Sequence, residues 1–171
     1  MTSVIRILAV LLLGMWLGAA VFFSVSVAPN VFSVLRHADL ANASTLAGSI
    51  VSPLLSALNR AGFEIGIFLL VMSFFLTAGQ SLSKRLAHLI SAAVFAASTG
   101  VGHWVIAARI AALRAAMQMP IDQISPGDER RIAFDALHRY SVIVFAVAIC
   151  AAAIAFVLLA LDRKRADRET S

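Results

Sequence analysis

The sequence predicts an all-α membrane protein, a bundle of four transmembrane helices with a kinked connection after the first helix. Of its 171 residues, 61% are hydrophobic and only 13% are charged. A soluble domain averages about 45–50% apolar and about 25% charged residues. The mean hydropathy is +0.92, and long apolar runs alternate with short polar segments. We therefore expect a single membrane domain that covers residues 1–171.

The first transmembrane helix is expected at about residues 4–28. From Val4 to Val27 the chain is almost continuously apolar, which at 1.5 Å per residue gives about 36 Å and is enough to cross a hydrocarbon core of about 30 Å. A secretory signal peptide is the alternative. Its apolar region is shorter, about 7–15 residues, and Pro29 would follow the cleavage point, so we favour a retained helix. Because Pro29 has no N–H and disfavours helical geometry at Ala28, it predicts an end or a kink there.

The second helix is expected at about residues 62–80, and the segment before it allows two interpretations. Leu46–Leu58 is apolar but too short to span a bilayer alone, and it contains Pro53. It is either an interfacial helix or the outer part of one long bent helix that continues into the second span. We favour the long helix.

The third and fourth helices are expected at about residues 86–108 and 135–161. A polar interval with a Ser125-Pro126-Gly127 turn separates them, and a charged tail follows at 162–171. Four spans place both termini on one side of the membrane. Basic residues are divided equally between the two sides, but they are denser in the shorter segments of the terminal side. This favours a bacterial inner membrane with cytoplasmic N- and C-termini.

Small residues recur at four-residue spacing on each predicted helix. Gly14 and Gly18 lie on the first, and Gly62 and Gly66 on the second; alanines continue the pattern on the other two. In membranes, helices associate by close backbone approach through such residues. The pattern indicates a tight bundle rather than a wide aqueous pore.

Individual side chains also carry structural predictions. Trp16 falls near the middle of the first helix, so it is expected to pack in the bundle. Arg60 and Glu64 are four residues apart and predict an ion pair on a helix surface. The single cysteine, Cys150, lies in an apolar run and is expected to pack as a small hydrophobe.

A group of polar residues is expected near the outer membrane boundary: His103, His138, Glu64 and His37. Histidines with a carboxylate can bind copper or haem, and this set is our candidate metal site. Interfacial residues paired with each other and with lipid headgroups are the preferred alternative. Two further metal patterns are weaker. Met117-Gln118-Met119 offers soft ligands, and His88 with His103 has the spacing of paired haem ligands but no matching pair on another helix.

Several blocks of the sequence resemble the transmembrane-protein-205-like domain family. They are GMWLGAAVFFSVSVAPNVF (14–32), LAGSIVSPLLSAL (46–58), the pair Arg109 and Arg114, and FDALHRYS (134–141). The likeness covers residues 8 to 160. Members of that family are small, four-helix integral membrane proteins without an established activity. The resemblance therefore implies the fold and implies no catalytic residues.

These observations favour a non-enzymatic membrane protein without a cofactor. We expect it to act in the lipid bilayer by helix packing with itself, as a homo-oligomer, or with a membrane partner. A copper- or haem-handling protein is the alternative, and a permease for a small neutral solute is a third. Although the net charge is +5, no basic stripe is interleaved with aromatics, so we expect no nucleic-acid partner.

Overall fold

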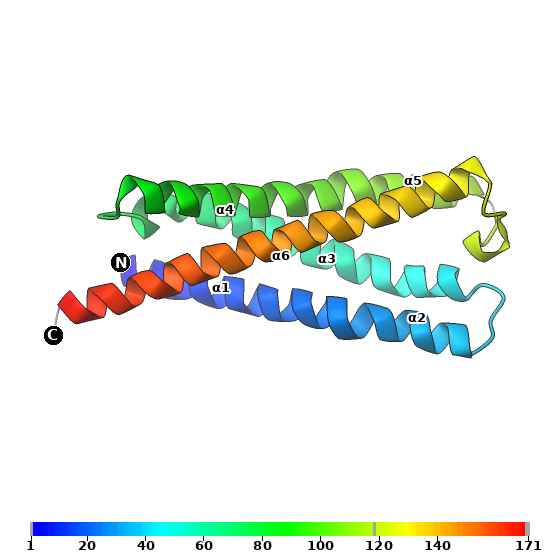
Figure 1. Cartoon of the computed structure of the whole chain (residues 1–171), viewed down its shortest axis with the longest axis horizontal. Coiled ribbons are helices and arrows are strands. Elements are labelled where there is room, and N and C mark those ends of the chain that lie inside the picture. The colour runs from blue at the N-terminus through cyan, green and yellow to red at the C-terminus, as the bar shows by residue number, and fades with distance from the viewer. Residues whose placement is uncertain (1, 118, 170–171) are drawn as a thin grey trace.

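The protein is a bundle of four long helical runs (Figure 1). The computed structural model describes residues 2–117 and 119–169. Within these ranges the predicted all-α fold with four membrane-spanning helices is confirmed. The elements are α1 (Thr2–Phe22), η1 (Phe23–Val27), α2 (Ala28–His37), α3 (Ala43–Leu76), α4 (Leu82–Gly100), η2 (Val101–Ile106), α5 (Ala107–Met117), η3 (Ile121–Gln123) and α6 (Glu129–Glu169).

The four runs alternate in direction and form a closed ring. The α1 helix contacts α3 and α6, and α4 contacts the same two helices from the opposite side. Figure 1 shows both termini beside the α3–α4 turn, which we call the terminal end, and the α2–α3 and α5–α6 connections at the opposite, loop end. Gly79 in the α3–α4 turn has a φ of 77°, a conformation that glycine adopts without a steric cost.

The first helical run does not end at Ala28. The irregularity predicted before Pro29 is present as a π-helical segment, η1, but the chain then continues as α2 to His37. Pro29 lies in the first turn of α2 and has no N–H to donate, and the Ala28 N–H before it bonds to the Phe23 carbonyl. The wider π turn before it takes up the mismatch in hydrogen bonding. The predicted end at residue 28 is therefore wrong, and the helical run continues for about 10 more residues, the length of α2.

The other three helices also begin before their predicted starts, and the third and fourth continue past their predicted ends, whereas the second ends at Leu76 instead of residue 80. The α3 helix is continuous from Ala43 to Leu76 through Pro53, which confirms the long helix and rules out a separate interfacial helix. Helical structure in the third run reaches Met117, beyond the predicted end at residue 108. The fourth begins at Glu129 and includes residues 162–169 of the charged tail, while residues 170–171 lie outside the described ranges. Charged side chains on exposed faces leave backbone hydrogen bonding intact, so polarity alone did not mark these ends.

The helices are longer than a bilayer requires. The four candidate spans contain 34, 34, 36 and 33 residues. At 1.5 Å per residue each is about 50 Å long, whereas the hydrocarbon core is about 30 Å thick. Each helix therefore has about 20 Å to spare.

The apolar core occupies the terminal half of the bundle. The predicted packing of Trp16 is confirmed, because its ring lies edge-on to Phe95 with centroids 4.7 Å apart and to Phe145 at 5.9 Å. Its Nε1 donates a 2.8 Å hydrogen bond to the Leu58 carbonyl. The largest fully buried apolar side chains of the core are Leu13, Leu69, Leu76, Phe95 and Leu159. Cys150, by contrast, is exposed on α6, so its predicted burial in helix packing is wrong.

Small residues bring α3 and α4 close together. A Cβ added to Gly66 would lie 2.7 Å from the Ala96 Cβ and 2.9 Å from its Cα, and one on Gly62 would also overlap its neighbours. On α1 the pattern is looser. A Cβ on Gly14 would make an ordinary contact of 3.4 Å, and one on Gly18 would meet nothing within 4 Å. The predicted small-residue packing is confirmed for the α3–α4 pair, but Gly18 contributes nothing to it.

At the loop end, a carboxylate from the α5–α6 connection caps α3. Asp122 accepts hydrogen bonds from the backbone N–H groups of Ser44 and Thr45, at 3.2 and 3.1 Å, and from the Thr45 hydroxyl at 3.2 Å. Burial raises the pKa of Asp122, but these hydrogen bonds outweigh it and leave the pKa below its ordinary value. The carboxylate satisfies N–H groups that have no partner within α3 and complements the positive end of the helix dipole.

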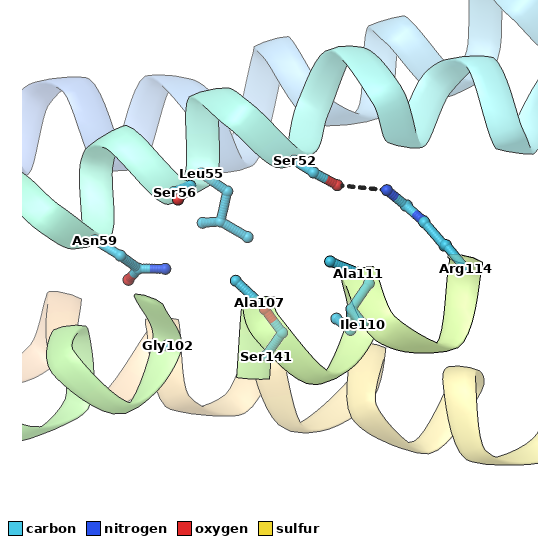
Figure 2. A pocket seen from close by; sticks show the side chains of 10 residues that line it. All are labelled: Ser52, Leu55, Ser56, Asn59, Gly102, Ala107, Ile110, Ala111, Arg114 and Ser141. Carbon is cyan, nitrogen blue, oxygen red and sulfur yellow. Dashed lines mark hydrogen bonds between the residues drawn. The ribbon is translucent and has the colours of Figure 1, made fainter. Parts of the chain in front are cut away.

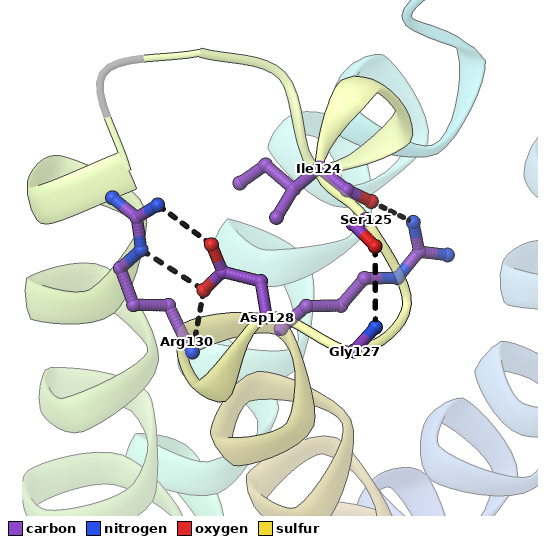
Figure 3. Close-up of polar contacts among 6 residues, drawn as sticks. Ile124, Ser125, Gly127, Asp128 and Arg130 are labelled. Carbon is purple, nitrogen blue, oxygen red and sulfur yellow. Dashed lines mark hydrogen bonds and ion pairs between the residues drawn. The ribbon is translucent and has the colours of Figure 1, made fainter.

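A second carboxylate caps α6. Asp128 accepts from the backbone N–H of Arg130 at 2.8 Å and pairs with its guanidinium at 2.7 Å (Figure 3). The Arg130 side chain beside it lowers the pKa of Asp128 to about 2. Arg131 donates to the carbonyls of Ile124, at 2.6 Å, and Ile121, at 3.1 Å. These contacts hold the connection against the start of the helix.

Candidate functional site

Three of the four predicted metal ligands are exposed side chains at separate places. His37 bonds through Nδ1 to the Ser33 carbonyl of its own helix at 2.7 Å. Glu64 accepts from Arg60 at 3.0 Å, and both side chains are exposed, so the predicted ion pair is confirmed. His138 is exposed on α6. Each of these side chains points outward from the helix that carries it.

The fourth predicted ligand, His103, faces the bundle. It is half-buried in η2, its Nδ1 shares a 2.9 Å hydrogen bond with the Ser56 hydroxyl of α3, and its ring lies edge-on to Trp104. Residues 2–117 and 119–169 contain no group of three or more histidine, cysteine, aspartate or glutamate side chains that could hold a metal ion. The structure therefore does not assemble the four predicted ligands into one such site.

The two weaker metal patterns are also separated. His88 and His103 are 15 residues apart on one helical run, which is about 22 Å by helix rise and too far to share an iron. Met117 is 3% exposed and Met119 52% exposed, so their thioethers lie in different environments. Gln118, between them, lies outside the described residues.

A different site is formed where α3, η2, α5 and α6 meet on the loop-end side of the core. It is a partly enclosed cavity of about 90 Å³ (Figure 2). A water molecule occupies about 30 Å³ in the liquid, so the cavity has room for about three. Apolar atoms form most of its surface, and the polar side chains that line it are Ser52, Ser56, Asn59, Arg114 and Ser141. We call it the Asn59–Arg114 cavity.

Asn59 is a buried amide without a hydrogen-bond partner. It is 3% exposed, its Oδ1 is fully enclosed, and no described residue bonds to its side chain. Figure 2 shows the amide beside Gly102, with its nitrogen directed to the cavity. A Cβ on Gly102 would lie 2.8 Å from that nitrogen, so glycine is required for the amide to fit. An unsatisfied buried polar group costs about 1–3 kcal/mol.

Arg114 places a positive charge at the other end of the cavity. Its side chain is half-buried, and Nη1 donates to the Ser52 hydroxyl at 3.0 Å and more weakly to the Gly48 carbonyl at 3.4 Å. The guanidinium lies 5.4 Å from the centroid of the Phe134 ring, within the range of a cation–π contact. A Cβ on Gly48 would overlap the guanidinium. No carboxylate of a described residue pairs with Arg114.

Sequence reasoning missed this cavity. It treated Arg114 as part of a polar connection and gave Asn59 no role. One signal was available, because an asparagine within a long apolar helix must be satisfied by something. The role of the glycines could be found only from the structure. Gly48 and Gly102 lie outside the small-residue pattern, and they make room for the Arg114 and Asn59 side chains instead of for a neighbouring helix.

Searches of protein-family models, curated protein sequences and solved structures found no match for this chain. The likeness to the transmembrane-protein-205-like domain family therefore stays a prediction from sequence.

Proposed function

We propose that this is a non-enzymatic integral membrane protein that binds a small polar ligand in the Asn59–Arg114 cavity. The observation that carries the proposal is the buried, unpartnered amide of Asn59 in the same cavity as the Arg114 guanidinium. Folding leaves these two groups without adequate partners, and this has a cost in stability. A ligand that bonds to both groups offsets that cost when it binds.

The position of the cavity supports access from outside the hydrocarbon core. Arg60 and Glu64 form their exposed ion pair on α3, 12 to 16 residues from its end at Leu76, which is about 18–24 Å from the terminal end. Exposed charges at this height mark the edge of a core about 30 Å thick. The spare 20 Å of each helix then extends on the loop-end side, and the cavity lies at the base of this projecting half.

We further propose that the protein resides in a bacterial cytoplasmic membrane with both termini in the cytoplasm. The cavity then opens towards the periplasmic side. Reporters that work only in the cytoplasm or only in the periplasm, fused after residue 171 and within 119–128, test this orientation. A periplasmic signal from the C-terminal fusion contradicts it.

Binding is tested by thermal unfolding of the full chain in detergent with a panel of small anionic, cationic and neutral polar solutes. We expect at least one class to raise the unfolding temperature of the natural protein and not that of Asn59→Leu. If no class has an effect, the proposal fails.

Absorption spectra and elemental analysis of the same sample test copper or haem handling. Bound metal that is lost in His103→Ala would favour that function instead.

A second candidate, association with another copy or a membrane partner, is supported by α2. This helix has no buried residue, and Val34 and nearby Leu40 are 65% and 43% exposed at the loop end. Apolar side chains that project beyond the hydrocarbon core favour contact with protein. Chemical cross-linking in membranes tests this. We expect Val34→Asp to reduce any cross-linked species, and only monomer in both proteins would contradict the candidate.

A further inference from the structure

We propose that the ligand of the Asn59–Arg114 cavity is a small oxyanion, a phosphate group either free or carried by a lipid headgroup. This inference rests on the proposed binding function and specifies its ligand. Three features of the cavity lead to it: an uncompensated positive charge, a lining rich in hydrogen-bond donors, and a limited volume.

The charge comes from Arg114. Its guanidinium is half-buried between α3, α5 and α6, and no described carboxylate balances it. Only Nη1 has protein partners, the Ser52 hydroxyl and the Gly48 carbonyl, which leaves Nε and Nη2 without a hydrogen bond to any described residue. An anion in the cavity supplies the missing countercharge, and a guanidinium is a group that binds oxyanions through charge-assisted hydrogen bonds.

The remaining polar groups favour the same class of ligand. The Asn59 amide directs its nitrogen to the cavity. The Ser141 hydroxyl can donate, and the Ser56 hydroxyl can donate when His103 Nδ1 carries the proton of the bond between them. No aspartate or glutamate lines the wall. A cation would meet the Arg114 charge without a carboxylate to offset it. A ligand that only accepts hydrogen bonds and carries negative charge satisfies the donors among these groups, whereas the enclosed Asn59 Oδ1 is itself an acceptor and takes no bond from it.

The size limits the anion. A volume of about 90 Å³ equals about three water molecules, so one oxyanion group fits and a nucleotide or a sugar does not. The cavity is partly open and lies at the height of the exposed Arg60–Glu64 pair. At this height both a lipid phosphate and a dissolved phosphate can reach it.

The test measures phosphate-dependent stability of the full chain in a sugar-based detergent without phosphate. Inorganic phosphate is added at constant ionic strength against chloride, and in a second arm phosphatidylglycerol is compared with an uncharged glycolipid. Arg114→Gln removes the charge. Arg109→Gln is the matched control, because Arg109 is exposed on the same helix. Asn59→Asp is a second variant, whose new carboxylate places a negative charge in the cavity and repels the anion while keeping the side-chain shape.

We expect phosphate, phosphatidylglycerol or both to raise the unfolding temperature of the natural protein and of Arg109→Gln equally. The apparent affinity should fall at least tenfold in Arg114→Gln and be lost in Asn59→Asp. A response to the lipid alone identifies a headgroup as the source, and a response to inorganic phosphate alone identifies a free anion. If only neutral or cationic solutes stabilise the natural protein, the oxyanion inference is overturned while the proposed binding function stands. If no solute does, both are overturned.

Discussion

Replacing Gly66 by alanine should destabilise the bundle, whereas the same change at Gly18 should not. At Gly66 the new Cβ would lie 2.7 Å from the Ala96 Cβ and 2.9 Å from the Ala96 Cα. The Cα is backbone, so α3 and α4 must separate. Such overpacking costs about 1–3 kcal/mol. At Gly18 the Cβ meets nothing within 4 Å.

Both substitutions gain the same helix propensity, up to about 1 kcal/mol, so the difference between the two variants isolates the overpacking. We expect Gly66→Ala to be less stable than Gly18→Ala by about 1–3 kcal/mol. The assay is reversible unfolding in mixed micelles, followed by circular dichroism. If the two variants agree within about 0.5 kcal/mol, which is the range of an unconstrained surface change, the close α3–α4 approach is refuted.

Three other substitutions test the cap of α3, the ion pair on the surface of α3 and a hydrogen bond in the core. Asp122→Asn should lower the unfolding temperature at pH 7. Because the pKa of Asp122 is lowered in the folded protein, the carboxylate stabilises the fold above the ordinary carboxyl pKa of about 4, and this stabilisation is lost as the pH falls through the folded pKa. A difference in unfolding temperature between the variant and the natural protein that persists at pH 2 would contradict the cap. Glu64→Gln should change stability by no more than about 0.5 kcal/mol, since the pair is exposed. Trp16→Phe should cost about 1 kcal/mol for the lost bond to Leu58, and no change in unfolding free energy would contradict that bond.

The lengths of the hydrophobic runs predicted the number and order of the helices. Within lipid, only helices and closed barrels satisfy all backbone hydrogen bonds. Helix ends were harder to predict. Pro29 suggested an end, yet a proline in a first turn after a π segment is tolerated. Arg109 and Arg114 were assigned to a connection, yet they lie on α5. Polarity shows where the membrane ends, and a helix can continue beyond that point.

The predicted metal ligands lie apart, and one of them is close to the Asn59–Arg114 cavity. His103 lies near the cavity through its bond to Ser56, whereas Glu64 and His138 face outward. Helical spacing shows which residues share a face within one helix. It does not show which face of the next helix they meet, so the pairing of Asn59 with Gly102 required the three-dimensional arrangement.

The π segment η2 sets the rotation of everything that follows it in the third run. A π turn contains one residue more than an α turn, and one residue corresponds to about 100° around a helix axis. Deleting a single residue within Val101–Ile106 would let the helix continue as a regular α-helix and turn Arg114 away from Ser52 and the cavity. The extra residue therefore sets the rotation of α5 relative to α4, and with it the direction in which Arg114 points from the Asn59–Arg114 cavity towards Ser52.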